Sequence, residues 1–300
     1  MTGDSGYDMM SMKIQEGQGG NMKRRKCLWI LILVLLFCVA LLFSPIGAPI
    51  RSYVVMRPYS AFCYRDSLMK KDSIRFRIPG GASTKKPDWY PFVMTFNDSE
   101  GLSRYLGEQV EFTILYNFGY FPLSKGTSSY YVPGSDYYSS FYGGYIIKPG
   151  DKNRRFGFLP DGKIDAGEIV KVPEYDQRAL VLSSIGCPWE ESVFREEISS
   201  VQYSVQYAGY GDWVRIDSGI RTNSPVHEYR GFQQGYLQYG RTPGRLSHSG
   251  DFPVIDLAGR VYVRYFEEYH ATIVLYIMAP SLETVNECDR EILSKTTIGK

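Results

Sequence analysis

One feature near the N-terminus constrains this chain more than any other: residues 27–43 form an unbroken apolar run of 17 residues. No charged residue follows until Arg51, so the uncharged stretch is 24 residues long. At about 1.5 Å of rise per helical residue it would measure about 36 Å, and the hydrocarbon core of a bilayer is about 30 Å thick. The run therefore predicts a transmembrane helix over residues 27–47.

The four residues that precede this run, 23–26, are all Lys or Arg. Because positive charges are retained on the cytoplasmic side of a membrane helix, they predict a single-pass plasma-membrane protein with residues 1–26 in the cytoplasm. This segment is polar and lacks periodicity, so we expect a disordered tail. Residues 51–300 are then extracytoplasmic.

A cleaved signal peptide is the alternative interpretation of the same segment. The apolar region of a signal peptide usually has about 7–15 residues and is followed by a small-x-small cleavage site. Here the run is longer, and cleavage after Ala48 would place Ile46 where a small residue is required. An uncleaved signal anchor is therefore favoured, and both interpretations place residues 51–300 outside.

The slight basicity of the chain comes from the segment that precedes the apolar run. The formal net charge is +2, and residues 1–26 alone carry five basic and three acidic side chains. Residues 51–300 carry 29 charges of each sign and are neutral overall. A neutral outer domain argues against nucleic acid as a partner. The expected partners are the lipid bilayer and an envelope glycan or protein.

Alternating side chains predict that the outer domain is built from β-strands. The chain contains 25 Tyr, and aromatic residues make up 15% of it, a composition that favours pleated, half-buried surfaces. The clearest strand is 110–118, where one face is apolar and aromatic. The adjacent runs 260–269 and 271–279 predict one hairpin or one long bent strand. Further short strands are expected at 73–78, 90–96, 145–148, 168–172, 179–184, 201–207 and 213–216.

Helical patterns are few. Residues 188–198 form one short candidate, and a second helix is expected behind Ser281, a residue type that caps helix N-termini. About ten short strands, turns rich in Gly and Pro and two minor helices predict an all-β domain over residues 51–300. We expect a sandwich or a jelly-roll-like architecture.

A segment rich in Tyr, Ser and Gly, residues 119–145, is the most suggestive binding feature. Tyr offers rigid, amphipathic contact area at a low entropy cost, and Ser and Gly let the backbone adapt to a protein or a glycan. The alternative interpretation is that these rings pack on the domain itself, in strand edges and tight turns. The candidate ligand-binding residues are Tyr130, Tyr131, Tyr137, Tyr138 and Tyr142.

Cysteine and histidine spacing predicts neither a metal site nor a cofactor. Three cysteines, Cys63, Cys187 and Cys288, lie outside the apolar run, so at most one disulfide bond can form within the outer domain. No paired Cys or His spacing typical of zinc ligands occurs. The odd number leaves the pairing of these cysteines open.

A cell-envelope hydrolase or transpeptidase is the alternative function. Cys187 precedes Pro188 and two acids, a pattern that places it at a helix N-terminus, where a helix dipole favours a thiolate. His270 follows later in the chain, and this order of Cys before His resembles that of papain-like hydrolases, although no flanking motif matches. Acids adjacent in sequence are weaker candidates, because neighbouring side chains diverge on helices and strands.

The two functions therefore stand as follows. We expect a membrane-anchored protein that displays an extracytoplasmic binding or interaction domain for an unknown ligand. In the alternative, the chain is a cell-envelope hydrolase or transpeptidase that uses Cys187 and His270, or acidic residues.

Overall fold

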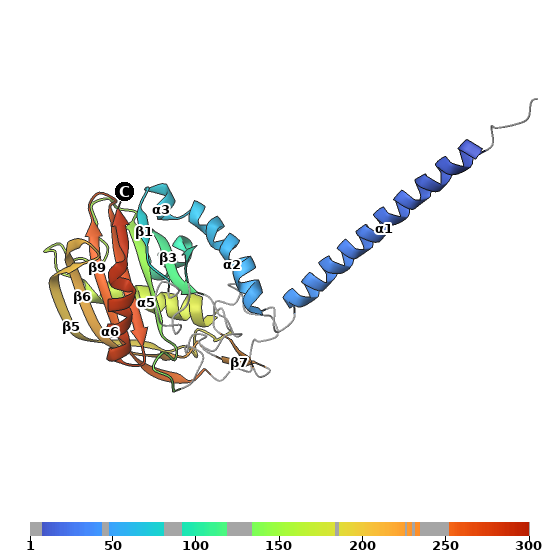
Figure 1. Cartoon of the computed structure of the whole chain (residues 1–300). Helices are drawn as coiled ribbons and strands as arrows, with labels where there is room; N and C mark the ends of the chain where they lie inside the picture. Colours follow the sequence, from blue (N-terminus) through green and yellow to red (C-terminus); the bar gives the residue numbers. More distant parts are fainter. Residues whose placement is uncertain are drawn as a thin grey trace, which may run out of the picture. The chain divides into compact units, whose positions relative to one another are not determined.

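The computed structural model describes residues 8–43, 48–80, 92–118, 134–183, 186–225, 227–229, 232–234 and 252–299 (Figure 1). The chain divides into two compact units, Met1–Arg51 and Ser52–Lys300. In the first unit, helix α1 (Asp8–Phe43) contains the apolar run and begins within the segment for which the sequence predicts disorder. Within the described ranges, no helix is at once long and apolar enough to cross a membrane. The predicted tail and anchor stay predictions.

The second unit is built on a seven-stranded sheet in which every neighbouring pair is antiparallel. Two short strand pairs accompany it, β1 (Arg75–Arg77) with β11 (Thr297–Gly299) and β7 (His227–Tyr229) with β8 (Phe232–Gln234). The seven strands, in their order across the sheet, are β2 (Phe92–Asn97), β3 (Val110–Phe118), β4 (Phe141–Pro149), β10 (Ala271–Ala279), β9 (Val254–Phe266), β6 (Tyr210–Asn223) and β5 (Phe194–Tyr207).

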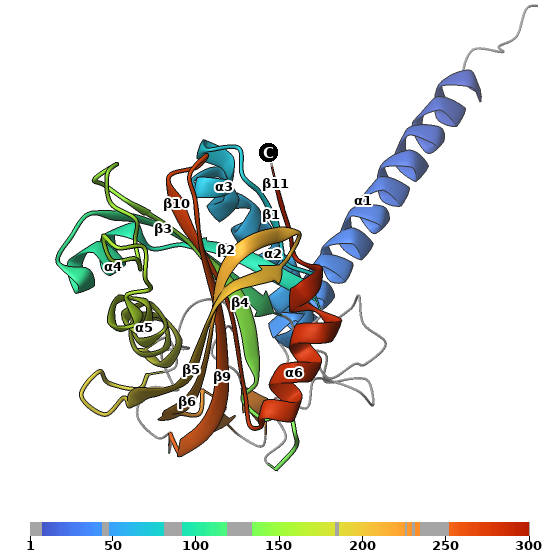
Figure 2. The same ribbon diagram turned by 90° about the vertical axis from the view of Figure 1, so that its left-hand side faces the viewer.

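Helices cover both faces of this sheet (Figure 2). One face packs against α4 (Ser99–Leu106), α5 (Ala166–Tyr175) and the π-helix η4 (Asp176–Leu182). The other face packs against α3 (Leu68–Lys71), α6 (Leu282–Glu291) and the 3₁₀-helix η5 (Leu293–Lys295). Helix α2 (Ala48–Arg65) precedes α3.

The central strand β10 shows why both faces need a cover. Val274 and Tyr276 point into the core under α5, whereas Ile273 and Leu275 point into the core under α6. A strand that is apolar on both faces is typical of a sheet buried on both sides. Two cores therefore share one sheet.

Local signals define the ends of the helices. The Asp98 side chain accepts a hydrogen bond from the Gly101 N–H at 3.3 Å and begins α4, and Gly107 ends it with φ 74°. The Ser281 hydroxyl accepts from the Thr284 N–H at 3.2 Å and begins α6. The predicted cap at Ser281 is thus confirmed.

The predicted β-rich composition with minor helices is confirmed, and strand 110–118 and the β9–β10 hairpin lie where the sequence predicts them. The predicted sandwich or jelly-roll-like architecture is wrong: the described residues contain one large sheet with helices on both faces, not two large sheets packed together.

The error comes from three short segments. Residues 168–172 and 179–184 read as strands but lie mainly in α5 and η4, and the predicted helix 188–198 contains the start of β5. Short apolar runs fit a buried helix as well as a strand. In α5, Ile169 and Val172 lie three residues apart on the buried side.

Two neighbouring glycines let large side chains cross strand β4. A Cβ atom on Gly143 would lie 2.7 Å from the Tyr276 hydroxyl and closer still to the Leu115 carbonyl oxygen. A Cβ atom on Gly144, on the opposite face, would lie 2.9 Å from the Phe76 ring. Both faces of the sheet therefore use the missing side chains of β4 as packing space.

We expect Gly143→Ala to lower the free energy of unfolding by about 1–3 kcal/mol, because the new methyl group overpacks a buried site bounded by backbone. Urea denaturation of the full chain, followed by circular dichroism, measures this change. Gly219→Ala in β6 is the matched control, since a Cβ atom there meets nothing within 4 Å. Equal stability of the two variants would contradict the packing role of Gly143.

Candidate functional site

The first candidate site is the junction between helix α2 and strand β2, which ends the sheet order on one side. The Thr95 N–H donates to the Ser60 hydroxyl oxygen at 2.8 Å. The Asn97 side-chain amide donates to the Cys63 carbonyl oxygen at 2.6 Å. Helix α2 thus takes up hydrogen-bonding groups that an outermost strand otherwise leaves open.

The Thr113 hydroxyl connects three chain segments at this junction. It donates to the Asn97 side-chain oxygen at 2.9 Å and accepts from the Leu68 N–H at 3.0 Å. Thr113 is only 1% exposed, so both bonds are made away from solvent. We call the set Ser60, Cys63, Leu68, Thr95, Asn97 and Thr113 the edge clamp.

Ser67 stabilises the turn from α2 to α3 beside the edge clamp. Its hydroxyl donates to the Tyr64 carbonyl oxygen at 2.7 Å and accepts from the Lys70 N–H at 3.3 Å, which caps α3. Ser67 is fully buried. The turn therefore has its own polar partners and presents the Leu68 N–H to Thr113.

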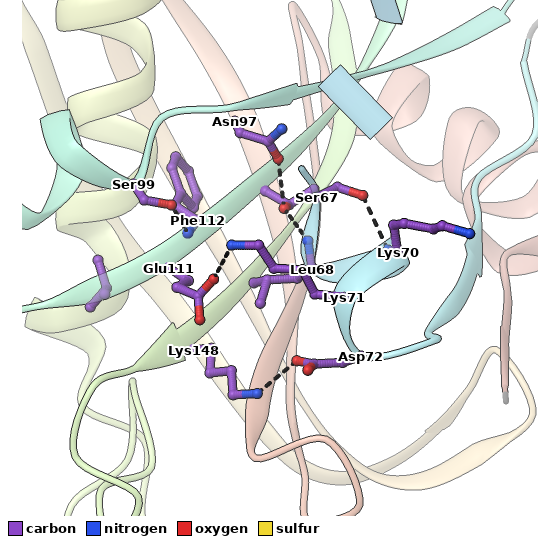
Figure 3. A network of polar contacts seen from close by, with 12 residues as sticks. Ser67, Leu68, Lys70, Lys71, Asp72, Asn97, Ser99, Glu111, Phe112 and Lys148 are labelled. Carbon is purple, nitrogen blue, oxygen red and sulfur yellow. Dashed lines mark hydrogen bonds and ion pairs between the residues drawn. The ribbon is translucent and has the colours of Figure 1, made fainter. Parts of the chain in front are cut away.

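Two ion pairs flank the edge clamp (Figure 3). Lys71 Nζ lies 2.5 Å from Glu111 Oε2, and Lys148 Nζ lies 2.7 Å from Asp72 Oδ2. Both pairs are partly exposed, and exposed pairs contribute between about 0 and 1 kcal/mol. The buried hydroxyl and amide groups, rather than these charges, hold α2 and α3 on the sheet.

We expect Thr113→Val to lower the free energy of unfolding by about 1–3 kcal/mol. The change preserves side-chain shape but leaves the Leu68 N–H and the Asn97 side-chain oxygen without their buried partner. Chemical denaturation of the full chain measures the loss.

Thr222→Val is the matched control for this prediction. Thr222 is fully buried, and its hydroxyl has no hydrogen-bond partner among the described residues. Its removal is therefore expected to be neutral or stabilising. Equal destabilisation by both substitutions would show that the Thr113 hydroxyl has no special role.

The second candidate site is a buried carboxyl group at the first residue of the π-helix. Asp176 is 3% exposed and accepts hydrogen bonds from the hydroxyls of Tyr116 and Tyr145, the latter at 2.6 Å. The Tyr276 ring stacks on Tyr145 with a centroid distance of 4.6 Å. Turns of π-helix occur often at functional sites. The cluster joins η4 to strands β3, β4 and β10.

Burial raises the pKa of the Asp176 carboxyl to about 7, and the hydrogen bonds from Tyr116 and Tyr145 oppose this rise. Burial also raises the pKa of each surrounding hydroxyl, those of Tyr116, Tyr145 and Tyr276, well above its ordinary value, and the negative charge of Asp176 adds to this effect. These hydroxyls therefore stay protonated. The group that changes charge near neutral pH is Asp176.

The raised pKa of Asp176 predicts that stability depends on pH in a defined direction. An unfolded Asp has a pKa near 4, so the folded chain binds the extra proton between about pH 4 and pH 7. The stabilising contribution is fully present below about pH 4 and is lost as the pH rises through about 7. We expect Asp176→Asn to remove this decline, which urea denaturation between pH 4 and pH 8 measures.

Asp217→Asn provides the opposite case. Asp217 lies 2.6 Å from both Arg260 and Arg215, and these bonds outweigh burial, so the pKa of its carboxyl is lowered. Its contribution is present above about pH 4, and its replacement should therefore destabilise the chain at neutral pH. An unchanged pH slope in the Asp176→Asn variant would contradict the titration of that group.

A third polar cluster lies on the α6 face of the sheet. Arg260, which is buried in β9, contacts Asp217 at 2.6 Å and Asp289 of α6 at 2.9 Å. The Tyr262 hydroxyl also donates to Asp289, at 2.6 Å. Because each charge has an opposite partner, this cluster is suited to holding α6 on the sheet.

The structure places the described members of the predicted tyrosine surface against the domain. Tyr142 is fully buried and donates to the Pro79 carbonyl oxygen at 3.1 Å. Tyr137 and Tyr138 are half-buried; Tyr137 donates to Glu287 at 2.9 Å, and Tyr138 accepts from the Ser224 hydroxyl at 3.2 Å. Packing, the alternative interpretation, thus describes these rings. Tyr130 and Tyr131 lie outside the described residues.

The structure does not assemble the predicted catalytic pair. Cys187 is buried in the core under α5 and α4, and burial followed by the charge of Glu191 raises the pKa of its thiol, which opposes thiolate formation. His270 is exposed in the turn between β9 and β10, with φ 49°. Cys187 follows η4 rather than beginning a helix. Its Sγ contacts the carbonyl oxygen of Pro188 at 3.7 Å.

Within the described ranges, the cysteines form no disulfide bond and the acids form no metal-binding group. All five cysteines are free thiols. Among the described residues, no group of three or more His, Cys, Asp or Glu side chains is placed to hold a metal ion. Among the acidic candidates, Glu196 accepts from Ser218, and Glu267 pairs with Arg155.

The chain matches no protein-family model, no curated protein and no solved structure. Function therefore has to be inferred from the chain itself. Sequence reasoning did not identify Thr113, Asn97 or Asp176. Thr113 alternates with Phe112 and Ile114, so the period-two pattern of β3 places it opposite the apolar face and does not single it out.

Proposed function

We propose that this chain is a single-pass plasma-membrane protein that displays a β-rich interaction domain outside the cytoplasm. Residues 1–26 are its cytoplasmic tail, 27–47 its anchor and 51–300 its outer domain. The exposed apolar side chains along α1, from Leu28 to Leu41, support this proposal. A large contiguous apolar surface is stable only against a membrane or a partner, and the basic block at 23–26 indicates a membrane.

The edge clamp is the observation that carries the proposal furthest. Helix α2, which follows the apolar run in the sequence, is fixed to strand β2 through the Ser60 hydroxyl and the side-chain amide of Asn97. A fixed attachment beside the anchor suits a domain that is held at a membrane and presented to a partner.

The contacts of the outer domain favour binding over catalysis. Its most buried ionised groups, such as Arg260 and Asp289, form internal pairs. The catalytic candidates Cys187 and His270 lie in a core and in an exposed turn, respectively. No described arrangement favours the hydrolase or transpeptidase. The proposed ligand is an envelope glycan or protein, as expected for a neutral domain.

The anchor is tested by placing two charges in the apolar run of the full chain. Wild-type protein should stay with the membrane pellet after alkaline carbonate extraction, and the Leu33→Lys/Val34→Lys variant should not, because Lys costs about 2.5–3.5 kcal/mol at the centre of a membrane helix. Ile198→Lys/Val201→Lys, at two exposed positions of β5, is the control and should stay in the pellet. Release of wild-type protein would contradict the anchor.

Orientation and binding need separate measurements. Protease added to intact cells should remove a C-terminal tag, whereas an N-terminal tag should be protected. Full-length protein in nanodiscs should sediment with insoluble envelope glycan, or bind the membrane-protein fraction, from its source cells. Heat-unfolded protein is the control. Absence of binding to both fractions would contradict an interaction domain.

A further inference from the structure

Helix α2 exposes one aromatic side chain, Phe62, on the side that faces away from the sheet. At about 100° per residue, Ser60 and Cys63 lie on the face that contacts β2, and Phe62 lies roughly opposite that face. Phe62 is 60% exposed, more than any other large apolar side chain described outside α1. Tyr59 and Tyr64 flank the sheet-facing side and are 46% and 42% exposed.

Helix α2 carries positive charge. The helix contains three arginines, Arg51, Arg57 and Arg65, and no acidic residue, since the next acid is Asp66. Arg65 lies three residues after Phe62 and is exposed. Basic residues combined with exposed Phe and Tyr are typical of helices that lie in the headgroup region of a membrane.

The position of α2 in the chain restricts what can cover this side. Only residues 44–47 separate α1 from α2. If the apolar run is anchored in a bilayer, α2 therefore begins in the sequence only a few residues beyond the anchor.

We propose that Phe62 and Arg65 rest on the surface of a bilayer that contains anionic lipid. This inference depends on the proposed anchor and adds a second, interfacial membrane contact to it. The Phe62 ring enters the boundary between headgroups and acyl chains, and Arg65 pairs with lipid phosphates, whereas the Tyr59 ring packs against Phe96 of β2 with a centroid distance of 5.8 Å. The edge clamp on the opposite side of α2 then sets the orientation of the sheet relative to the membrane.

The test uses the full chain in nanodiscs of phosphatidylcholine with 30% phosphatidylglycerol. A photoreactive benzoylphenylalanine replaces Phe62, and mass spectrometry of the irradiated protein measures lipid adducts. Tyr203 is the matched control position, because it is an exposed aromatic residue, 51% exposed, on strand β5. We expect at least about tenfold more lipid adduct at position 62 than at position 203. Equal yields, or adducts with protein instead of lipid, would overturn the inference.

Arg65→Gln tests the electrostatic part. In the same nanodiscs it should lower the lipid adduct at position 62 several-fold, whereas Arg104→Gln on α4, another exposed arginine, should not. Equal effects of the two substitutions would overturn the role of Arg65. Failure of the chain to enter nanodiscs would contradict the anchor itself, and entry without adducts at position 62 would contradict the surface contact alone.

Discussion

Hydrogen-bond satisfaction at the two outermost strands is the constraint on which the arrangement of this domain depends. At β2 the Ser60 hydroxyl accepts from the Thr95 N–H and the Cys63 carbonyl accepts from the Asn97 side chain, so α2 covers this edge. At β5 the register with β6 shifts near Ile198, Gln202 and Val205, which blunts a long outer strand. One edge is covered by a helix and the other is made irregular, so the sheet ends differently at its two sides.

The two faces of the sheet follow from a similar requirement. Each holds an acid with polar partners: Asp176 is buried and accepts from tyrosine hydroxyls on one face, and Asp289 contacts Arg260 and Tyr262 on the other. A hydroxyl donates without neutralising a carboxylate, so burial dominates at Asp176 and raises its pKa to about 7. At Asp217 the guanidinium groups of Arg215 and Arg260 supply the opposite charge, and the pKa of its carboxyl is lowered despite burial.

These differences also explain how far the sequence could predict the structure. Period-two alternation located β3 and the β9–β10 hairpin, and a single Ser located the start of α6, because those signals are local. The short apolar run at 168–172 fits a strand as well as a helix, so α5 was missed, and with it the layer that replaces a second sheet. Asp176 meets Tyr116 across 60 residues of chain, so no spacing rule could join them. For Tyr142, which the sequence suggested as a binding residue, the alternative interpretation of packing on the domain itself describes the structure.

The two sides of helix α2 have different roles, and this limits which residues of α2 can vary. Its turns present Ser60 and Cys63 inward and Phe62 and Arg65 outward. Inward substitutions would free the sheet edge, whereas outward ones would change only what α2 meets outside the domain. A stable sheet edge therefore requires no large aromatic residue at position 62. Phe62 is 60% exposed, and we therefore assign its ring to a surface outside the chain.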